Sequence, residues 1–252
     1  MNTTRTSPAP LRVAVVTGAG GGLGRAFSTA LARDGWTVAA LGRTLSSLSA
    51  TVTDCLAASA DNRTPQPHSA VVCDVTDASS VTEAFRTVTE RYDRLDLLVN
   101  NAGIPGPTGR IDTVHPSEVE QTFRTNSLGT LLCTQAAFTW MAAHGGGRII
   151  NNGSIAAHAP RAGAAAYAAS KAAVASLTIS TALDGREYGI SATQLDIGNA
   201  RTELLETFSS TEPMFDAAEA AHLLVTVAAL PAGVSVDAVR VTAAGMPYLG
   251  RG

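Results

Sequence analysis

The sequence has few cysteines, few aromatic side chains and no long hydrophobic run. Its three cysteines, Cys55, Cys73 and Cys133, lie far apart in 252 residues, and no pair has the spacing of a metal site or redox motif. Scattered thiols in odd number are typical of a reducing compartment, so we expect a cytoplasmic protein without disulfides or bound metal. No run of about 18 apolar residues is present, which predicts no transmembrane helix and no membrane partner.

An excess of charge of one sign is also lacking. The chain carries 18 Lys and Arg against 21 Asp and Glu, and no basic run. Nothing in this balance favours a nucleic-acid partner. Residues 1–10 are polar and contain proline, which predicts a short disordered lead, and residues 11–252 are long enough for one catalytic domain.

Short apolar runs alternate with amphipathic segments along this domain. We expect strands at residues 11–17, 37–41, 71–73, 95–100, 148–152, 190–195 and 236–241. We expect helices at residues 22–34, 45–59, 78–92, 116–143, 164–183, 202–208 and 217–229. This alternation predicts an α/β fold, a Rossmann-like doubly wound parallel sheet of about seven strands with helices on both faces. Residues 199–220 are expected to form a lid-like segment.

A glycine-rich turn separates the first expected strand from the first helix. It reads Thr17-Gly18-Ala19-Gly20-Gly21-Gly22-Leu23-Gly24. Bare backbone and the free N–H groups of a helix N-terminus together suit a pyrophosphate. The same glycines also fit a tight turn without a ligand, and the pattern leaves both open. If a dinucleotide binds, we expect contacts from Gly18, Gly20, Gly22, Leu23 and Gly24.

The second expected strand ends without an acidic residue, at Leu41-Gly42-Arg43-Thr44. A site that binds a free ribose 2′-hydroxyl usually has an acid here, whereas Arg43 could pair with a 2′-phosphate. This favours NADP(H) as cofactor, with NAD(H) possible. The alternative is that Arg43 is a solvated surface residue.

Three side chains in the second half of the chain suit proton transfer. Tyr167 and Lys171 are four residues apart in a helical stretch, so they share one face, and an ammonium beside a phenol favours the phenolate. Tyr167 could then exchange a proton with a substrate oxygen that Ser154 holds. The same pair could also be an ordinary exposed helix pair.

With these motifs the sequence resembles the ordinary-length, single-domain branch of the short-chain dehydrogenases/reductases. The resemblance extends from about residue 11 to about residue 245 and rests on motifs in the family's order. They are Thr17-Gly18-x-x-x-Gly22-x-Gly24, Asp74-Val75, Asn100-Asn101-Ala102-Gly103, Asn126, and Ser154 followed by Tyr167 and Lys171.

The resemblance implies a role for each of four catalytic residues. Tyr167 would be the acid in reduction and the base in oxidation, and Ser154 would bind the reacting oxygen. Lys171 would bind the nicotinamide ribose and lower the pKa of Tyr167. Asn126 would bend its helix and hold a water in a proton relay. The resemblance also implies cofactor contacts from Asp74, Val75, Asn101, Ala102, Gly103, Tyr167, Lys171, Ile197, Gly198 and Thr202.

The chain departs from the family's pattern at three places. Ile197-Gly198 stands where the family usually has Pro-Gly, and Gly153 stands where a serine usually precedes the catalytic one. The usual Asp-Gly-Gly near the end is missing. Two further residues, His158 and Arg161, lie between Ser154 and Tyr167, where they could orient a polar substrate or simply be solvated.

We therefore expect an NADP(H)-dependent oxidoreductase that transfers a hydride between nicotinamide and a carbonyl or secondary alcohol carbon. Its partner would be a small to mid-sized organic substrate, and the resemblance implies a homodimer or homotetramer. Two alternatives remain open: a non-catalytic NADP(H)-binding sensor or scaffold, and a dehydratase or epimerase on the same scaffold.

Overall fold

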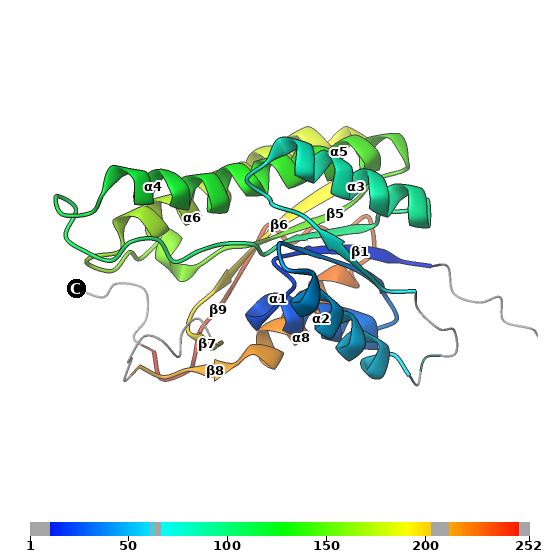
Figure 1. The fold of residues 1–252 in the computed structure, drawn as a ribbon, viewed down its shortest axis with the longest axis horizontal. Coiled ribbons are helices and arrows are strands. Elements are labelled where there is room, and N and C mark those ends of the chain that lie inside the picture. The colour runs from blue at the N-terminus through cyan, green and yellow to red at the C-terminus, as the bar shows by residue number, and fades with distance from the viewer. Residues whose placement is uncertain (1–10, 61, 63–66, 203–211, 247–252) are drawn as a thin grey trace, which may run out of the picture.

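A seven-stranded sheet lies at the centre of the protein (Figure 1). The computed structural model describes residues 11–60, 62, 67–202 and 212–246. All neighbouring strands in this sheet are parallel, in the order β3-β2-β1-β4-β5-β6-β9. The strands are β1 (Val13–Thr17), β2 (Thr37–Gly42), β3 (Ser69–Val72), β4 (Leu97–Asn100), β5 (Gly147–Asn152), β6 (Ile190–Ile197) and β9 (Ala238–Val241).

Helices cover both faces of the sheet, as the sequence predicts (Figure 1). One face carries α1 (Gly22–Arg33), α2 (Leu45–Ala58) and α8 (Ala217–Ala228), and the other carries α3 (Ala78–Tyr92), α4 (Pro116–Phe123), α5 (Gly129–Ala143) and α6 (Ala165–Gly185). Among the described helices, none has the length and apolar character to span a bilayer.

The period of two along the strands divides the core between these two layers. Ala14 and Val16 of β1 pack with α1, α2 and α8, while Val13 and Val15 pack with α3 and α5. All five residues of β1 are buried, which is why the strand is almost entirely apolar.

The expected helix over residues 116–143 is not a continuous α-helix. Between α4 and α5 lies a single π-helical turn, η1 (Arg124–Leu128), in which the N–H of Gly129 bonds to the carbonyl of Arg124. Asn126 lies within this turn, and its side chain hydrogen-bonds to the backbone of Ile104. The π-helical turn, which has one residue more than an α-helical turn, therefore coincides with this side-chain contact.

A second, two-stranded ladder was not expected from the sequence. β7 (Ala200–Arg201) pairs in parallel with β8 (Phe215–Asp216), within the segment expected to form a lid. The expected helix at residues 202–208 falls almost wholly on residues 203–211, outside the described residues. The expected N-terminal lead, residues 1–10, also lies outside them.

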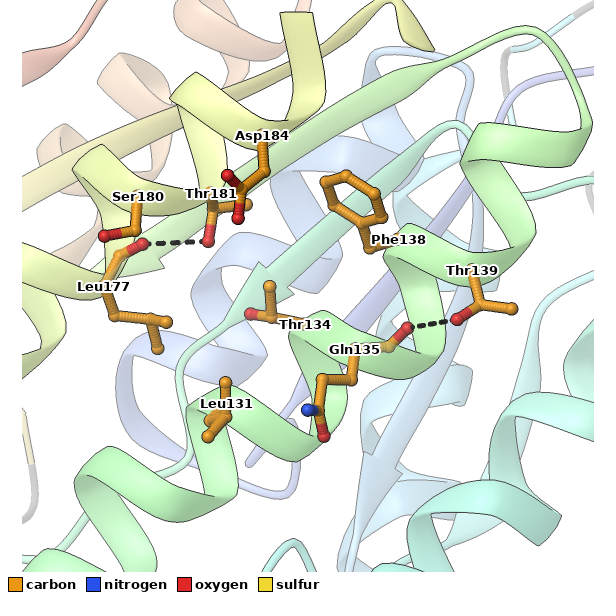
Figure 2. A pocket seen from close by; sticks show the side chains of 9 residues that line it. All are labelled: Leu131, Thr134, Gln135, Phe138, Thr139, Leu177, Ser180, Thr181 and Asp184. Carbon is orange, nitrogen blue, oxygen red and sulfur yellow. Dashed lines mark hydrogen bonds between the residues drawn. The ribbon is translucent and has the colours of Figure 1, made fainter. Parts of the chain in front are cut away.

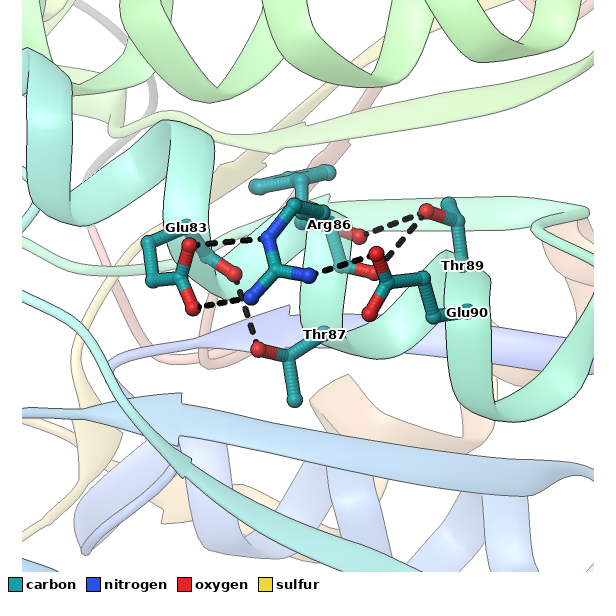
Figure 3. Close-up of polar contacts among 6 residues, drawn as sticks. Glu83, Arg86, Thr87, Thr89 and Glu90 are labelled. Atoms are coloured by element: carbon teal, nitrogen blue, oxygen red, sulfur yellow. Dashed lines mark hydrogen bonds and ion pairs between the residues drawn. The ribbon is translucent and has the colours of Figure 1, made fainter.

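Helix α3 shows how local signals fix an element. The Asp77 carboxylate accepts hydrogen bonds from the N–H groups of Ser79 and Ser80 and so caps the helix, a position that favours aspartate. On its outer face Arg86 lies between Glu83 and Glu90, one turn away on either side (Figure 3). These side chains are more than half exposed, so solvent screens both ion pairs and they add little to the stability of the fold.

The strand order reverses between β1 and β4. The chain runs outward from β1 through β2 to β3, and from β4 through β5 and β6 to β9. The carboxyl ends of β1 and β4 therefore lie side by side with connections leaving in opposite directions, which is where open α/β sheets bind their ligands.

A buried histidine joins β2 to the start of β3. The Nδ1 atom of His68 accepts the N–H of Val38 at 3.0 Å, and its Nε2 lies 3.2 Å from Ser59 Oγ. His68 is 6% exposed, and burial lowers its pKa from 6.5 to about 4. The ring is therefore neutral in the folded chain, with its proton on Nε2 for Ser59.

Stability should fall as the pH drops from about 6.5 towards 4. In this range the His68 ring is protonated in the unfolded chain but stays neutral in the folded chain. Protonation therefore favours unfolding. The free energy of unfolding, measured with urea, should be about 2 kcal/mol lower at pH 5 than at pH 7.5. His68→Asn keeps an acceptor for Val38 but cannot titrate, and should lose this slope, whereas the exposed-site control His222→Gln should keep it. An unchanged slope in His68→Asn would contradict this assignment.

Candidate functional site

The glycine-rich turn after β1 is tied to the end of β4. The Thr17 hydroxyl accepts the N–H groups of Asn101 and Ala102, at 3.0 and 3.1 Å. The Asn101 amide in turn donates to the carbonyls of Thr17 and Gly18. Residues far apart in the sequence are thus held together at the point where the strand order reverses.

Two of the glycines have no room for a side chain. Gly18 has φ +62°, and a Cβ there would lie 2.8 Å from the Ala102 Cα. A Cβ on Gly24 would overlap the Gly18 carbonyl oxygen and lie 2.6 Å from Asn101 Nδ2. The close approach of β1, α1 and β4 therefore requires bare backbone at both positions, whether or not a ligand binds.

Helix α1 begins without a side-chain cap. Its N-cap is Gly21, no side chain of the described residues hydrogen-bonds to the first turn, and that turn contains no acid. Gly20, Gly22 and Leu23 are partly exposed around this helix start. Thr202, after β7, also lies here, with its Cβ 3.7 Å from where a Gly22 Cβ would be. Uncapped N–H groups beside bare backbone can bind an anionic group such as a phosphate.

Arg43 lies at the end of β2 and is exposed. Its charge contributes to lowering the pKa of Asp74, although the largest cause is hydrogen bonding from the N–H and hydroxyl of Thr76. The structure thus brings Arg43 close to Asp74, which follows β3. The next residue, Val75, is buried against Gly129, where a Cβ would lie 2.8 Å from Val75 Cγ2.

Asn126 lies within η1 and is almost fully buried. Its Oδ1 accepts the N–H of Ile104 at 2.8 Å, and its Nδ2 donates to the Ile104 carbonyl and to Ser170 Oγ. Gly103 lies beside it, since a Cβ there would be 3.2 Å from Asn126 Oδ1 and 3.8 Å from Lys171 Nζ. Asn126, Gly103 and Lys171 therefore lie together although they come from three segments.

Ser154, Tyr167 and Lys171 converge at the carboxyl end of β5. Ser154 is 6% exposed, and it lies close enough to the Tyr167 hydroxyl to lower its pKa. Lys171 is 5% exposed, and its Nζ donates to the Asn152 carbonyl at 2.7 Å and lies 5.8 Å from the centre of the Tyr167 ring. Burial lowers the pKa of Lys171 to about 8, while the charge of Asp196 acts in the opposite direction.

The expected lowering of the Tyr167 pKa is not what the structure gives. Burial raises the pKa of Tyr167, a hydrogen bond from Ser154 lowers it, and the charge of Asp196 raises it further. The ammonium of Lys171 faces the ring and bonds to Asn152, and it does not offset the loss of water around the phenol. In the chain alone, Tyr167 therefore holds its proton more firmly than a free tyrosine does.

Residues at the end of β6 and on the loop after Ser154 pack beside the catalytic side chains. Gly198 follows Ile197 at the end of β6, and a Cβ on Gly198 would lie 2.7 Å from Ile155 Cδ1. The ring of His158 bonds to Asp196 at 2.7 Å, and Arg161 bonds to Asn199. Neither is a simply solvated loop residue.

Sequence reasoning missed Asp196, which lies buried behind Ser154 and accepts its N–H at 3.1 Å. The available signal was an acidic residue near the end of an otherwise apolar buried strand, since acids are almost never fully buried without a partner. Nothing in the sequence showed that its partners would be Ser154 and His158, because these lie about 40 positions earlier.

No group of three or more His, Cys, Asp or Glu side chains among the described residues could hold a metal ion. The three cysteines are free and buried, and burial raises the pKa of Cys55 to about 12 and of Cys73 to about 11. A side chain that keeps its thiol protonated is a poor metal ligand or nucleophile.

Gly153 should tolerate no larger residue. A Cβ there would overlap Gln194 Nε2 and Asp196 Oδ1, so Gly153→Ala must displace both side chains. We expect a loss of about 1–3 kcal/mol in the free energy of unfolding, measured by urea denaturation. The matched control is Gly233→Ala, because a Cβ at Gly233 meets nothing within 4 Å. Equal stability of the two variants would show that the site relaxes freely.

Comparison with known proteins agrees with this geometry. The family described as short chain dehydrogenase matches residues 12–213. Farnesol dehydrogenase of Aedes aegypti is 33% identical over 201 residues, covering 77% of this chain and 79% of its own. The 15-hydroxyprostaglandin dehydrogenase [NAD(+)] of Rattus norvegicus is 33% identical over 208 residues, covering 81% and 73%.

Solved structures give the same result. A metagenomic short-chain oxidoreductase in complex with NADP is 27% identical, with a TM-score of 0.78 and coverage of 91% of this chain and 96% of that one. Family, relatives and fold agree over most of the length: the chain belongs to the short-chain dehydrogenase family and is an oxidoreductase of alcohol or carbonyl substrates.

Proposed function

We propose that this protein is an NADP(H)-dependent oxidoreductase that transfers a hydride between nicotinamide and the carbonyl or secondary alcohol carbon of a small to mid-sized organic molecule. The observation that carries the proposal is the convergence of Ser154, Tyr167, Lys171 and Asn126 at the carboxyl ends of the central strands. This group adjoins the glycine turn, since Asn152, which accepts from Lys171, also donates to Asn101 at 2.9 Å.

The described residues fit a nicotinamide dinucleotide. The uncapped start of α1 and the bare turn suit its pyrophosphate, and no acid in that first turn opposes it. Asp74 and Val75 after β3, and Asn101, Ala102 and Gly103 after β4, lie at the same edge of the sheet. When bound, the cofactor supplies or accepts the hydride.

The chain's own residues would handle the proton. The Tyr167 hydroxyl, kept protonated by burial, would donate its proton to the carbonyl oxygen in reduction and take one back in oxidation. Ser154 would bind the same oxygen, since it lies close enough to the Tyr167 hydroxyl to lower its pKa. Lys171, which hydrogen-bonds to Asn152, would bind the nicotinamide ribose. Asn126 would hold the segment at Ile104 against α6 through its bonds to Ile104 and Ser170.

Tyr167→Phe should lower turnover by about 100-fold or more, because it removes the transferable proton and leaves the ring in place. NADPH binding, followed by nicotinamide fluorescence, should stay within about twofold. Tyr188→Phe makes the same chemical change at a half-exposed ring away from the site and should have no effect.

The assay should cover farnesol, a 15-hydroxyprostaglandin and a panel of cyclic and acyclic ketones, because two relatives are named for the first two substrates. Consumption of one cofactor per product excludes a sensor, a dehydratase and an epimerase. Full turnover by Tyr167→Phe would overturn the role given to Tyr167.

The preference for NADP(H) rests on Arg43. Arg43 is exposed at the end of β2, and this position has no acidic residue that would bind a ribose 2′-hydroxyl. The nearby carboxylate of Asp74 offsets part of the charge of Arg43. The NADP-bound relative supports this preference, and the relative named for NAD(+) leaves NAD(H) as a possible second cofactor.

Arg43→Ala should weaken NADPH binding by about 10- to 100-fold, as expected for the loss of one charge-assisted hydrogen bond. NADH binding should change by less than about twofold, since NADH has no 2′-phosphate for Arg43 to contact. Arg33→Ala removes an exposed arginine at the other end of α1 and serves as the control for net charge. Tighter binding of NADH than NADPH by the unaltered chain would refute the preference.

We also propose that the chain assembles as a homodimer or homotetramer through α5 and α6. A cleft between these helices is lined by Leu131, Phe138 and Leu177 together with polar side chains (Figure 2). On α6, Ile179 and Leu183 are 63% and 52% exposed, and they add to the apolar surface of this helix. Tyr167 and Lys171 lie on the same helix, so assembly would also restrict the motion of the helix that carries them.

Leu183→Glu should shift the chain towards monomer in light scattering after size-exclusion chromatography, because a carboxylate would be buried at the interface. Leu56→Glu is the matched control, since Leu56 is also 52% exposed but lies on α2. A monomeric unaltered chain would contradict the proposal.

The lid-like segment and the cellular location remain predictions. The contact of Thr202 with Gly22 supports a segment that lies over the glycine turn. The three free, buried cysteines are compatible with a reducing cytoplasm.

A further inference from the structure

Asp196 is a fully buried carboxylate immediately behind the candidate catalytic serine. It is 1% exposed and lies on β6, two residues before Gly198. Three groups bond to it: the Ser154 N–H at 3.1 Å, Gln194 Nε2 at 2.9 Å and His158 Nε2 at 2.7 Å. Burial of an acid is costly unless such bonds compensate it, so this position is closely specified.

The space for Asp196 exists because residue 153 is a glycine. A Cβ there would overlap both Gln194 Nε2 and Asp196 Oδ1. The serine that the family usually has at this position would not fit. Gly153, Gln194 and Asp196 therefore pack as one unit, in which the missing side chain makes room for the amide and the carboxylate.

A row of hydrogen bonds orients the amide that faces Asp196. Asn151 Nδ2 donates to Thr178 Oγ1 at 2.8 Å, and this hydroxyl lies 2.9 Å from Gln194 Oε1. Because an ionised carboxylate only accepts hydrogen bonds, the NH₂ group of Gln194 must face Asp196 and its Oε1 must face the Thr178 hydroxyl. The negative charge is thus fixed in place from β5 and α6 as well as from β6.

Four titratable side chains face this carboxylate from the surrounding elements. His158 lies on the loop after β5, and its side chain is 37% exposed. Arg240 of β9 is 3.9 Å from Asp196 Oδ2. Burial has the largest effect on the pKa of Tyr167 and Lys171 of α6, raising the first and lowering the second. The charge of Asp196 acts to raise the pKa of both. One buried anion therefore favours the protonated form of both proposed catalytic groups.

We propose that Asp196 is a positioning residue of the proton-transfer site: seated in the space left by Gly153, its carboxylate fixes the Ser154 backbone and the His158 ring and places one negative charge behind Ser154. The consequence for catalysis rests on the proposed function. The prediction for Tyr167 itself does not, because it concerns the chain without substrate or cofactor.

A purely structural role makes a different prediction. Asp196→Asn keeps the shape and the acceptor for the Ser154 N–H but removes the charge. If Asp196 only fills hydrogen bonds, this variant leaves the titration of Tyr167 unchanged. If its charge acts on Tyr167, the phenol must ionise at lower pH. Asp196→Ser is a second neutral variant with a smaller acceptor.

The test is a titration of the full chain labelled with ¹³Cζ-tyrosine, followed by NMR. The chain has four tyrosines, and Tyr167→Phe identifies the signal of Tyr167. In Asp196→Asn and Asp196→Ser, ionisation of Tyr167 should move to lower pH, the direction expected when one nearby negative charge is removed. Asp237→Asn removes an exposed carboxylate at the start of β9 and should cause no shift.

Turnover provides an independent readout. The pH at which alcohol oxidation reaches half its maximal kcat/KM should also fall in the two neutral variants, because oxidation needs the phenolate. If the unaltered chain turns over no substrate, the proposed function fails while the NMR titration still decides the role of Asp196.

Each remaining outcome decides the matter. An unshifted or upward-shifted Tyr167 signal in folded neutral variants overturns the proposal. Failure of both variants to fold, checked by circular dichroism and thermal melting, also overturns it, because Asp196 would then serve the core. A downward shift in both, with none in Asp237→Asn, supports it.

Discussion

The close approach of the backbone after β1 to the end of β4 is the constraint on which the site depends. It requires Gly18 and Gly24 to lack a Cβ, and it is held by the Thr17 hydroxyl and the Asn101 amide. Because the strand order reverses here, the connections diverge and leave backbone N–H groups unobstructed. The helix start behind the turn is left without a side-chain cap for the same reason.

The proton-transfer group is attached to this constraint through amides. Asn152 donates to Asn101 and accepts from Lys171, so the cation is placed relative to the glycine turn by two hydrogen bonds. Asn126 reaches the same place from the π-helical turn, where its bonds to Ile104 accompany the break between α4 and α5. The group is therefore assembled by backbone and amide contacts and not by direct pairs between charged residues.

Departures from a family pattern are more informative as a set than one at a time. Taken separately, Gly153 only replaces the family's usual serine, and Ile197 only replaces its usual proline. The structure shows that Gly153 makes room for Gln194 and Asp196, and that Asp196 contacts His158. Burial raises the pKa of the Tyr167 phenol, and the buried anion behind Ser154 adds to that rise.

The sequence by itself determined the architecture and much of the candidate site. Apolar strands, amphipathic helices and turn glycines are local signals, so the parallel sheet and nearly all its element boundaries followed from them, as did the capping of α3 by Asp77. The motif residues could be named because their spacing along the chain carries the resemblance.

Only the tertiary structure decided how charges and side chains meet across segments. The π-helical turn at Asn126, the β7–β8 ladder and the Asp196–His158 pair each depend on contacts between residues distant in the sequence. The direction of the Tyr167 pKa depends on burial and on an anion from another strand, neither of which a spacing of four residues can show. Local patterns fix which element forms, whereas electrostatics depends on distances that exist only once the elements have packed.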